Sequence, residues 1–232
     1  MFDSESKLMR IGNKFADLLL LNALTILFGL LVFTMGASLT AMHYVILKIY
    51  RDEDAYIFKD FWKSFKMNFR QSVLITLIYA AIGIVLGIDF YVVIKGGFRL
   101  GRYFICVLGL IAFFYLISLV WVFVIQSRYT YHIRNTMKFS IAVGVRYLGY
   151  SVMMILMSAV PVFCFLTMPG MVPFVLLMGL TIPGMIQAIL YSRVFDRLEG
   201  VDRSRAQEEE DNWTVEMPEE DQYTEDQHII EK

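Results

Sequence analysis

Four long stretches of this 232-residue chain contain no lysine or arginine, and they restrict the possible fold more than any other feature. They cover residues 15–47, 71–94, 103–127 and 147–192, and the last contains no charged residue at all. A helix that crosses a bilayer needs about 20 consecutive, mostly apolar residues. A soluble helical core would need polar faces that recur at every turn, which these stretches lack. The pattern predicts an all-α, polytopic transmembrane helix bundle.

Glycine, proline and charged residues divide these stretches into about six spans. We expect the spans near 15–34, 36–50, 71–94, 103–127, 147–167 and 173–191. The second span is short, because 15 helical residues extend only about 22 Å. A bundle of five spans, in which residues 36–50 enter and leave the membrane on one side, is the alternative.

The distribution of basic residues tests the number of spans, since lysine and arginine are enriched in cytoplasmic segments. With six spans and an internal N-terminus, 18 basic residues lie inside and three lie outside. The best arrangement with five spans has an external N-terminus, with 15 basic residues inside and six outside. The count favours six spans, a multi-pass protein of the cytoplasmic membrane and two cytoplasmic termini.

Residues 55–70 combine an aromatic stripe with a basic face. At about 100° per residue, one side of a helix carries Phe58, Phe61, Trp62, Phe65 and Phe69. The opposite side carries Lys59, Asp60, Lys63, Lys66 and Arg70. Between two stretches poor in charge, this pattern predicts an amphipathic interfacial helix at 55–70, with Asp54 as its N-cap. We expect the aromatic residues to anchor the helix, either in the lipid boundary or packed beneath the bundle.

The net charge of −1 conceals two oppositely charged parts of the chain. Residues 199–232 carry 13 acidic and three basic residues, whereas the preceding part has an excess of basic residues. We therefore expect a transmembrane domain at 1–198 and an acidic, disordered cytoplasmic tail at 199–232. The basic residues suit anionic lipid headgroups, and no nucleic acid is expected as a partner because no readout motif accompanies them.

Two titratable side chains within the predicted spans are candidates for function, because ionisable groups are costly inside a membrane. His43 lies in the short second helix and Asp89 lies toward the outer end of the third span. They are weak candidates for a solute path. The alternative for His43 is a hydrogen bond to a neighbouring helix, and the alternative for Asp89 is an ion pair with Lys95 or Arg99.

The remaining motifs favour packing over chemistry. Gly83 and Gly87 have the four-residue spacing of a close helix-packing motif, and Gln126 and Gln187 are expected to form interhelical hydrogen bonds. Cys106 and Cys164 lack metal-ligand spacing. The chain contains no phosphate-binding loop, dinucleotide fingerprint or hydrolase motif. We expect no enzymatic activity, no cofactor and no metal site.

Two adjacent motifs carry a resemblance to a known family. Residues 36–48 read Gly-Ala-Ser-Leu-Thr-Ala-Met-His-Tyr-Val-Ile-Leu-Lys, and residues 58–69 follow the pattern Phe-x-Asp-Phe-x-x-x-Phe-x-x-Asn-Phe. Over roughly residues 10–95 the chain resembles the YesL-like family of bacterial integral membrane proteins, which carry a domain of unknown function. The resemblance implies a bacterial cytoplasmic-membrane protein, often encoded beside ABC-type sugar uptake systems. The family has no established catalytic residues, so none is transferred.

Three hypotheses for function follow. The first is an accessory or assembly component linked to carbohydrate uptake and utilisation. Its partners are the lipid bilayer, subunits of an ABC-type sugar transporter, and further copies of the chain in a homo-oligomer. The alternative is a small solute permease that acts as an oligomer, and a second alternative is a membrane sensor that signals through the acidic tail.

Overall fold

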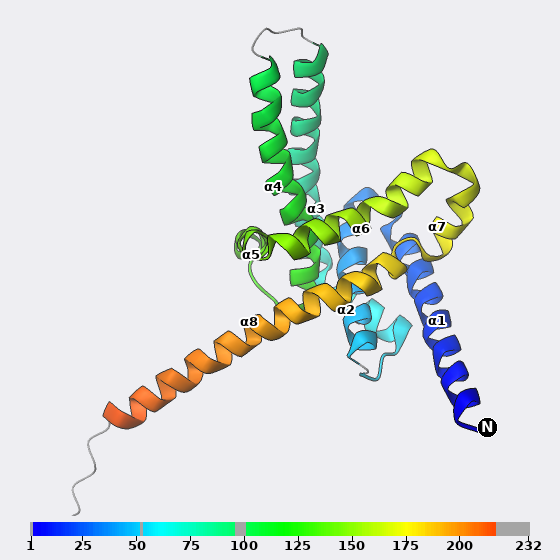
Figure 1. The fold of residues 1–232 in the computed structure, drawn as a ribbon, viewed down its shortest axis with the longest axis vertical. Coiled ribbons are helices and arrows are strands. Elements are labelled where there is room, and N and C mark those ends of the chain that lie inside the picture. The colour runs from blue at the N-terminus through cyan, green and yellow to red at the C-terminus, as the bar shows by residue number, and fades with distance from the viewer. Residues whose placement is uncertain (1, 52, 96–100, 217–232) are drawn as a thin grey trace, which may run out of the picture. The chain divides into compact units, whose positions relative to one another are not determined.

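The computed structural model describes the backbone of residues 2–51, 53–95 and 101–216, and this part of the chain is helical without a strand (Figure 1). The helices are α1 (Phe2–Gly29), α2 (Met35–Tyr50), α3 (Ile57–Lys95), α4 (Gly101–Arg128), α5 (Ile133–Arg146), α6 (Leu148–Thr167), α7 (Val172–Met178) and α8 (Thr181–Glu216). Two 3-10 turns, η1 (Val32–Thr34) and η2 (Pro169–Met171), precede α2 and α7. The all-α prediction is confirmed.

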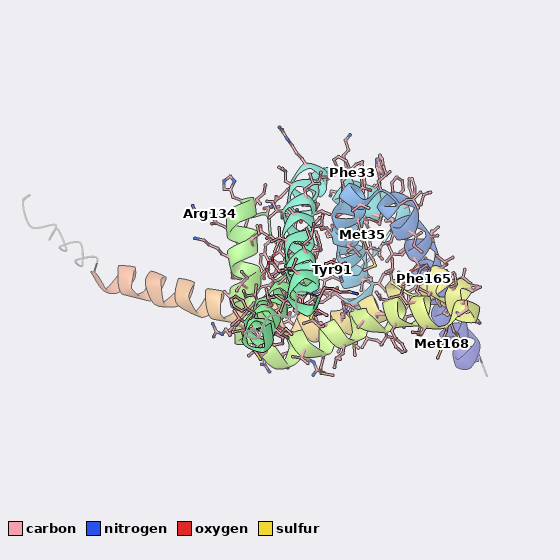
Figure 2. All side chains as sticks on the ribbon, turned by 90° about the horizontal axis from the view of Figure 1, so that it is seen from above. Phe33, Met35, Tyr91, Arg134, Phe165 and Met168 are labelled. Carbon is pink, nitrogen blue, oxygen red and sulfur yellow. The ribbon has the colours of Figure 1, made fainter. Side chains whose placement is uncertain are left out.

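Four helical segments of the described chain are long and apolar enough to cross a membrane: Val32–Tyr50, Ile57–Lys95, Phe104–Arg128 and Leu148–Thr167. A fifth span is possible where Pro169–Met178 and Thr181–Gly200 meet at 54°. Large apolar side chains lie on the surface (Figure 2), and Phe33 and Met168, for example, are 42% and 49% exposed. This is expected of a membrane protein, in which the outer surface meets lipid. The predicted number of six spans is not confirmed.

The first two predicted spans differ from the helices that form. The predicted break at Met35–Gly36 lies earlier, because α1 ends at Gly29 and the 3-10 turn η1 leads directly into α2. Helix α1 is not among the candidate spans of the described residues, and its apolar run contains Asp17 and Asn22. Helix α2, predicted to be a short span, is the central helix, and most of its residues are buried.

Small residues allow α2 to occupy the centre of the bundle. A Cβ atom on Gly36 would overlap the Thr76 hydroxyl and the ring of Phe123, so only glycine fits between α3 and α4 at this point. Ala37 and Ala41 are fully buried on the same helix. Helix–helix contact in a membrane depends on such close approach, because lipid supplies no hydrophobic force between helices.

The predicted interfacial helix 55–70 and the predicted span 71–94 are one continuous helix, α3. No glycine or proline occurs between Ile57 and Ile82, so nothing in the local sequence interrupts the backbone hydrogen bonds. Helices α3 and α4 lie side by side as an antiparallel pair (Figure 1). The turn at 96–100 that joins them lies outside the described residues.

Asp60 was predicted on the exposed basic face, and this was wrong. Its side chain accepts a hydrogen bond from Lys48 Nζ at 2.9 Å and another from the Tyr56 backbone N–H at 3.0 Å. Asp60 therefore satisfies a free N–H group at the start of α3, in place of the predicted N-cap Asp54. The ion pair also joins the end of α2 to the beginning of α3.

Helix α8 extends through part of the predicted disordered tail. The chain divides into two compact units, Met1–Ser192 and Arg193–Lys232, whereas the sequence pattern placed a boundary after residue 198. In the second unit the backbone remains helical to Glu216, because residues after Gly200 include many good helix formers and no proline before that point. Residues 217–232 lie outside the described part of the chain.

Candidate functional site

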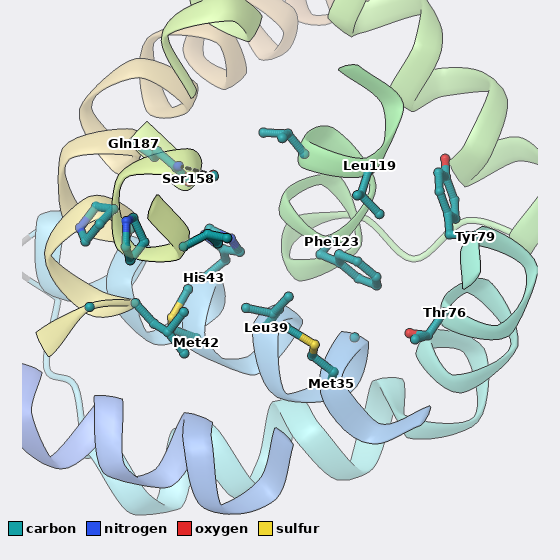
Figure 3. Close-up of a pocket in the computed structure, with 18 of the residues that line it drawn as sticks. Met35, Leu39, Met42, His43, Thr76, Tyr79, Leu119, Phe123, Ser158 and Gln187 are labelled. Atoms are coloured by element: carbon teal, nitrogen blue, oxygen red, sulfur yellow. Dashed lines mark hydrogen bonds between the residues drawn. The ribbon is translucent and has the colours of Figure 1, made fainter. Parts of the chain in front are cut away.

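A cavity of about 630 Å³ lies within the first unit, between α2, α3, α4, α6, α7 and the start of α8 (Figure 3). Its walls are mainly apolar and include Met35, Leu39, Met42, Leu119 and Phe123. Pockets that bind small molecules usually have volumes of about 300–1,000 Å³ and mostly apolar walls with a few polar groups. The size and lining of this cavity therefore suit a ligand.

Polar groups in the wall are few and, among the described residues, none is a carboxylate, lysine or arginine. The polar wall residues are His43, Thr76, Tyr79, Tyr115, Ser158 and Gln187. A ligand that carried a net charge would find no opposite charge in this wall. The electrostatics thus favour an uncharged occupant.

Most of these polar groups already form hydrogen bonds within the protein. Tyr115 Oη donates to the Tyr79 carbonyl at 3.0 Å, and Thr76 Oγ1 donates to the Ser72 carbonyl at 2.7 Å. Gln187 Nε2 donates to the Met154 carbonyl at 3.1 Å and to Ser158 Oγ at 2.8 Å, which confirms its predicted interhelical role. These bonds hold the walls together.

His43 is the exception among the polar wall residues. Its side chain is only 7% exposed, and Nδ1 has no hydrogen-bond partner within the described part of the structure. The ring extends from α2 toward the cavity (Figure 3) and meets the Tyr191 ring edge-on, with the ring centroids 5.7 Å apart. The hydrogen bond between these residues uses the His43 carbonyl, to which Tyr191 Oη donates at 3.4 Å. The side-chain bond to a neighbouring helix that was the alternative for His43 is not found at Nδ1.

An interrupted helix forms another part of the wall, through Gly179, Leu180, Pro183 and Gly184. Pro183 has no N–H to donate to the preceding turn, so the chain bends where α7 ends and α8 begins. Asn22 of α1 compensates for the break. Its Nδ2 donates to the Leu176 carbonyl at 2.7 Å, and its Oδ1 accepts the N–H groups of Leu180 and Thr181.

Asp89 is not part of the cavity. It is exposed near the end of α3, whereas the wall residues that α3 supplies are Thr76, Tyr79 and Ala80. The structure therefore does not bring His43 and Asp89 together in one site. The ion pairs considered for Asp89 involve Lys95 and Arg99, of which Arg99 lies outside the described residues.

The predicted packing glycines have different surroundings. A Cβ atom on Gly83 would lie 2.8 Å from Tyr115 Oη, so this glycine permits close contact with α4. A Cβ atom on Gly87 would meet nothing within 4 Å. Gly83 therefore packs against α4, whereas the face of α3 at Gly87 contacts no other described part of the chain.

The aromatic stripe on α3 is divided between the interior and the surface. Phe61 and Phe65 are buried, whereas Phe58, Trp62 and Phe69 are 60%, 44% and 38% exposed. Phe28 of α1 contacts Phe61, Trp62 and Phe65, with ring centroids between 5.3 and 5.8 Å apart. Part of the stripe thus packs against α1.

Comparison with known proteins adds family membership but no activity. Residues 18–90 match the family model DUF624, described as a protein of unknown function. The chain is 30% identical over 151 residues to the uncharacterized protein YteU of Bacillus subtilis (strain 168), an alignment that covers 64% of this chain and 67% of that protein. No solved structure matches.

Proposed function

We propose that this chain, which belongs to the DUF624 family of proteins of unknown function, acts without catalysis by binding an apolar ligand in the cavity beside His43. The observation that carries this proposal is the cavity wall itself. It is apolar, it lies among helices that can cross a membrane, and it contains a buried side-chain nitrogen without a partner. A membrane ligand can enter such a site from the surrounding lipid.

Filling the cavity tests this proposal. Leu119→Trp places a large side chain in the wall, and we expect the purified protein to lose co-purifying lipid measured by mass spectrometry. Leu116→Trp is the matched control, because Leu116 lies on the same helix, is 41% exposed and does not line the cavity. If the Leu119 variant retains as much lipid as the control, the cavity is not the binding site.

An accessory role in carbohydrate uptake is the second candidate. It is supported by the resemblance to YesL-like proteins and by large exposed apolar residues on α3, such as Ile84, Val85 and Ile88. A transporter subunit or another copy of the chain can pack against this face beside the open Gly87. Affinity capture from native membranes in mild detergent tests this role. Recovery of no ABC-type transport subunit counts against it.

A permease remains an alternative because an interrupted helix lines the cavity, as in some transporters. His43→Ala combined with Asp89→Ala should then reduce uptake of a sugar, and unchanged uptake of every sugar tested opposes this role. The sensor alternative depends on the acidic tail. Removal of residues 199–232 should abolish signalling but leave ligand retention intact, so a fully functional truncated protein excludes it.

A further inference from the structure

We propose that the cavity ligand is an uncharged, single-chain lipid with a small head whose oxygen accepts a hydrogen bond from His43. This inference rests on the proposed function and specifies its ligand. It follows from three properties of the site: the absence of charge in the described wall, the state of the His43 ring, and the dimensions of the apolar space.

The charge of the wall excludes the common charged lipid heads. The described lining has no lysine or arginine to bind a phosphate or carboxylate, and no aspartate or glutamate to bind an amine. A charged group buried without a partner is strongly disfavoured. The head that enters this cavity is therefore neutral.

The environment of His43 indicates which hydrogen bond the ligand forms. A neutral imidazole has one N–H and one bare nitrogen. Buried N–H groups without a partner are rarer in proteins than unpaired acceptors, so the unpartnered Nδ1 is the bare nitrogen. The proton then lies on Nε2 of a ring that lines the cavity. His43 presents a donor, which an alcohol or carbonyl oxygen can accept.

The remaining wall suits an alkyl or isoprenoid chain. Other wall donors, on Thr76, Tyr115 and Gln187, already bind protein oxygens, so they do not require a polar ligand. The apolar residues extend from α2 across α4 to Val162 and Phe165 of α6. A volume of about 630 Å³ falls within the range of about 300–1,000 Å³ for sites that enclose one small ligand.

Four probes with the same chain test the inference on the full-length protein in phosphatidylcholine nanodiscs. The probes are isotope-labelled hexadecanol, hexadecane, hexadecylamine and hexadecyl phosphate, and the measurement is the amount bound at equilibrium. We expect hexadecanol to bind about tenfold more tightly than hexadecane, the upper range for one net hydrogen bond. The two charged probes should bind more weakly than hexadecane.

His43→Phe identifies the donor, since it keeps a ring but removes both nitrogens. In this variant hexadecanol and hexadecane should bind equally. The matched control is His132→Phe, because His132 is exposed before α5 and does not line the cavity. The probe series on the unmodified protein still tests the ligand class if the His43 variant does not fold.

The outcomes separate this inference from the proposed function. If no probe binds, including hexadecane, the cavity does not hold an apolar ligand and the proposed function is wrong. If hexadecane binds but hexadecanol gains nothing, or a charged probe binds as tightly, the ligand class is wrong while the function stands. An unchanged preference for hexadecanol in a folded His43→Phe protein shows that His43 does not donate the hydrogen bond to the ligand.

Discussion

Several buried polar side chains in this protein join two helices. Trp121 Nε1 donates to Ser151 Oγ at 2.8 Å, and Ser151 Oγ donates in turn to the Gly144 carbonyl at 2.7 Å. This chain of bonds joins α4, α5 and α6. Lys48 and Asp60 do the same for α2 and α3, with side chains that are 21% and 12% exposed. In a membrane such groups are tolerated only when a partner satisfies them.

The Lys48–Asp60 ion pair gives a prediction at the scale of residues. Removal of one partner from a fully buried pair costs about 3–5 kcal/mol, and partial exposure reduces this to about 1–3 kcal/mol here. Asp60→Leu should destabilise more than Lys48→Met, because leucine also cannot accept the hydrogen bond from the Tyr56 N–H. Thermal unfolding in detergent measures both changes.

The exposed Lys66 provides the control for this ion pair. Lys66→Met should leave the unfolding temperature nearly unchanged, since exposed charges contribute about 0–1 kcal/mol. Equal effects of Lys66→Met and Lys48→Met would show that the ion pair does not join the two helices energetically.

Among the elements, the α7–α8 pair is bonded to a distant part of the chain. Gly179 and Pro183 interrupt the helix, and the interruption leaves backbone groups without partners inside the apolar region. Asn22 on α1 supplies those partners while being fully buried itself. One polar residue in a distant helix thus stabilises the bend that forms part of the cavity wall.

Asn22→Leu tests this dependence. The substitution keeps a side chain of similar size but removes the three hydrogen bonds to Leu176, Leu180 and Thr181. Interhelical hydrogen bonds in membrane proteins contribute roughly 0.6 to 1.7 kcal/mol each, so we expect a loss of about 1–3 kcal/mol in stability. The unfolding temperature and the amount of lipid that the purified protein retains should both fall.

Thr25→Val is the matched control on the same helix. Thr25 is also buried, but its hydroxyl donates only to the Leu21 carbonyl of its own helix among the bonds described. Replacement of Thr25 by valine should therefore lower the unfolding temperature only slightly. If the Thr25→Val and Asn22→Leu proteins were equally stable, the hydrogen bonds from Asn22 would not stabilise the bend between α7 and α8.

At the scale of the whole molecule, the membrane topology depends on whether α1 crosses the bilayer. Helix α1 is less apolar than the candidate spans, yet its residues Asn22 and Thr25 are buried and hydrogen-bonded. Those bonds reduce the cost of placing them in a membrane. We therefore propose that α1 crosses as a sixth span, with both termini in the cytoplasm of a bacterium, in accord with the distribution of basic residues.

Cysteine labelling measures this topology. In a background with Cys106 and Cys164 replaced by serine, Gly12→Cys should resist a membrane-impermeant maleimide in intact cells. Lys63→Cys should resist it as well, because this position is expected in the cytoplasm with either five or six spans. Met168→Cys should react, because this position is expected outside with either number of spans. All three positions are exposed in the structure. Rapid labelling at Gly12→Cys would place the N-terminus outside and leave five spans.

Local sequence patterns by themselves determined the helices that depend mainly on composition. Helices α4 and α6 begin and end within a few residues of the predicted spans, and η2 lies between the predicted spans 147–167 and 173–191. A run of apolar residues bounded by charge or proline needs no distant partner to be identified, because the cost of exposing polar groups to lipid is a local property.

The tertiary structure decided what each helix contacts. Length made 36–50 a short span and helical periodicity placed Asp60 on the basic face, whereas packing makes α2 the central helix and pairs Asp60 with Lys48. The cavity has the same origin. Its wall joins residues from distant parts of the chain, and the partner of each one depends on contacts that helical periodicity does not encode. His43 was identifiable as an unusual residue, but only the packed structure leaves its Nδ1 without a partner beside an apolar space.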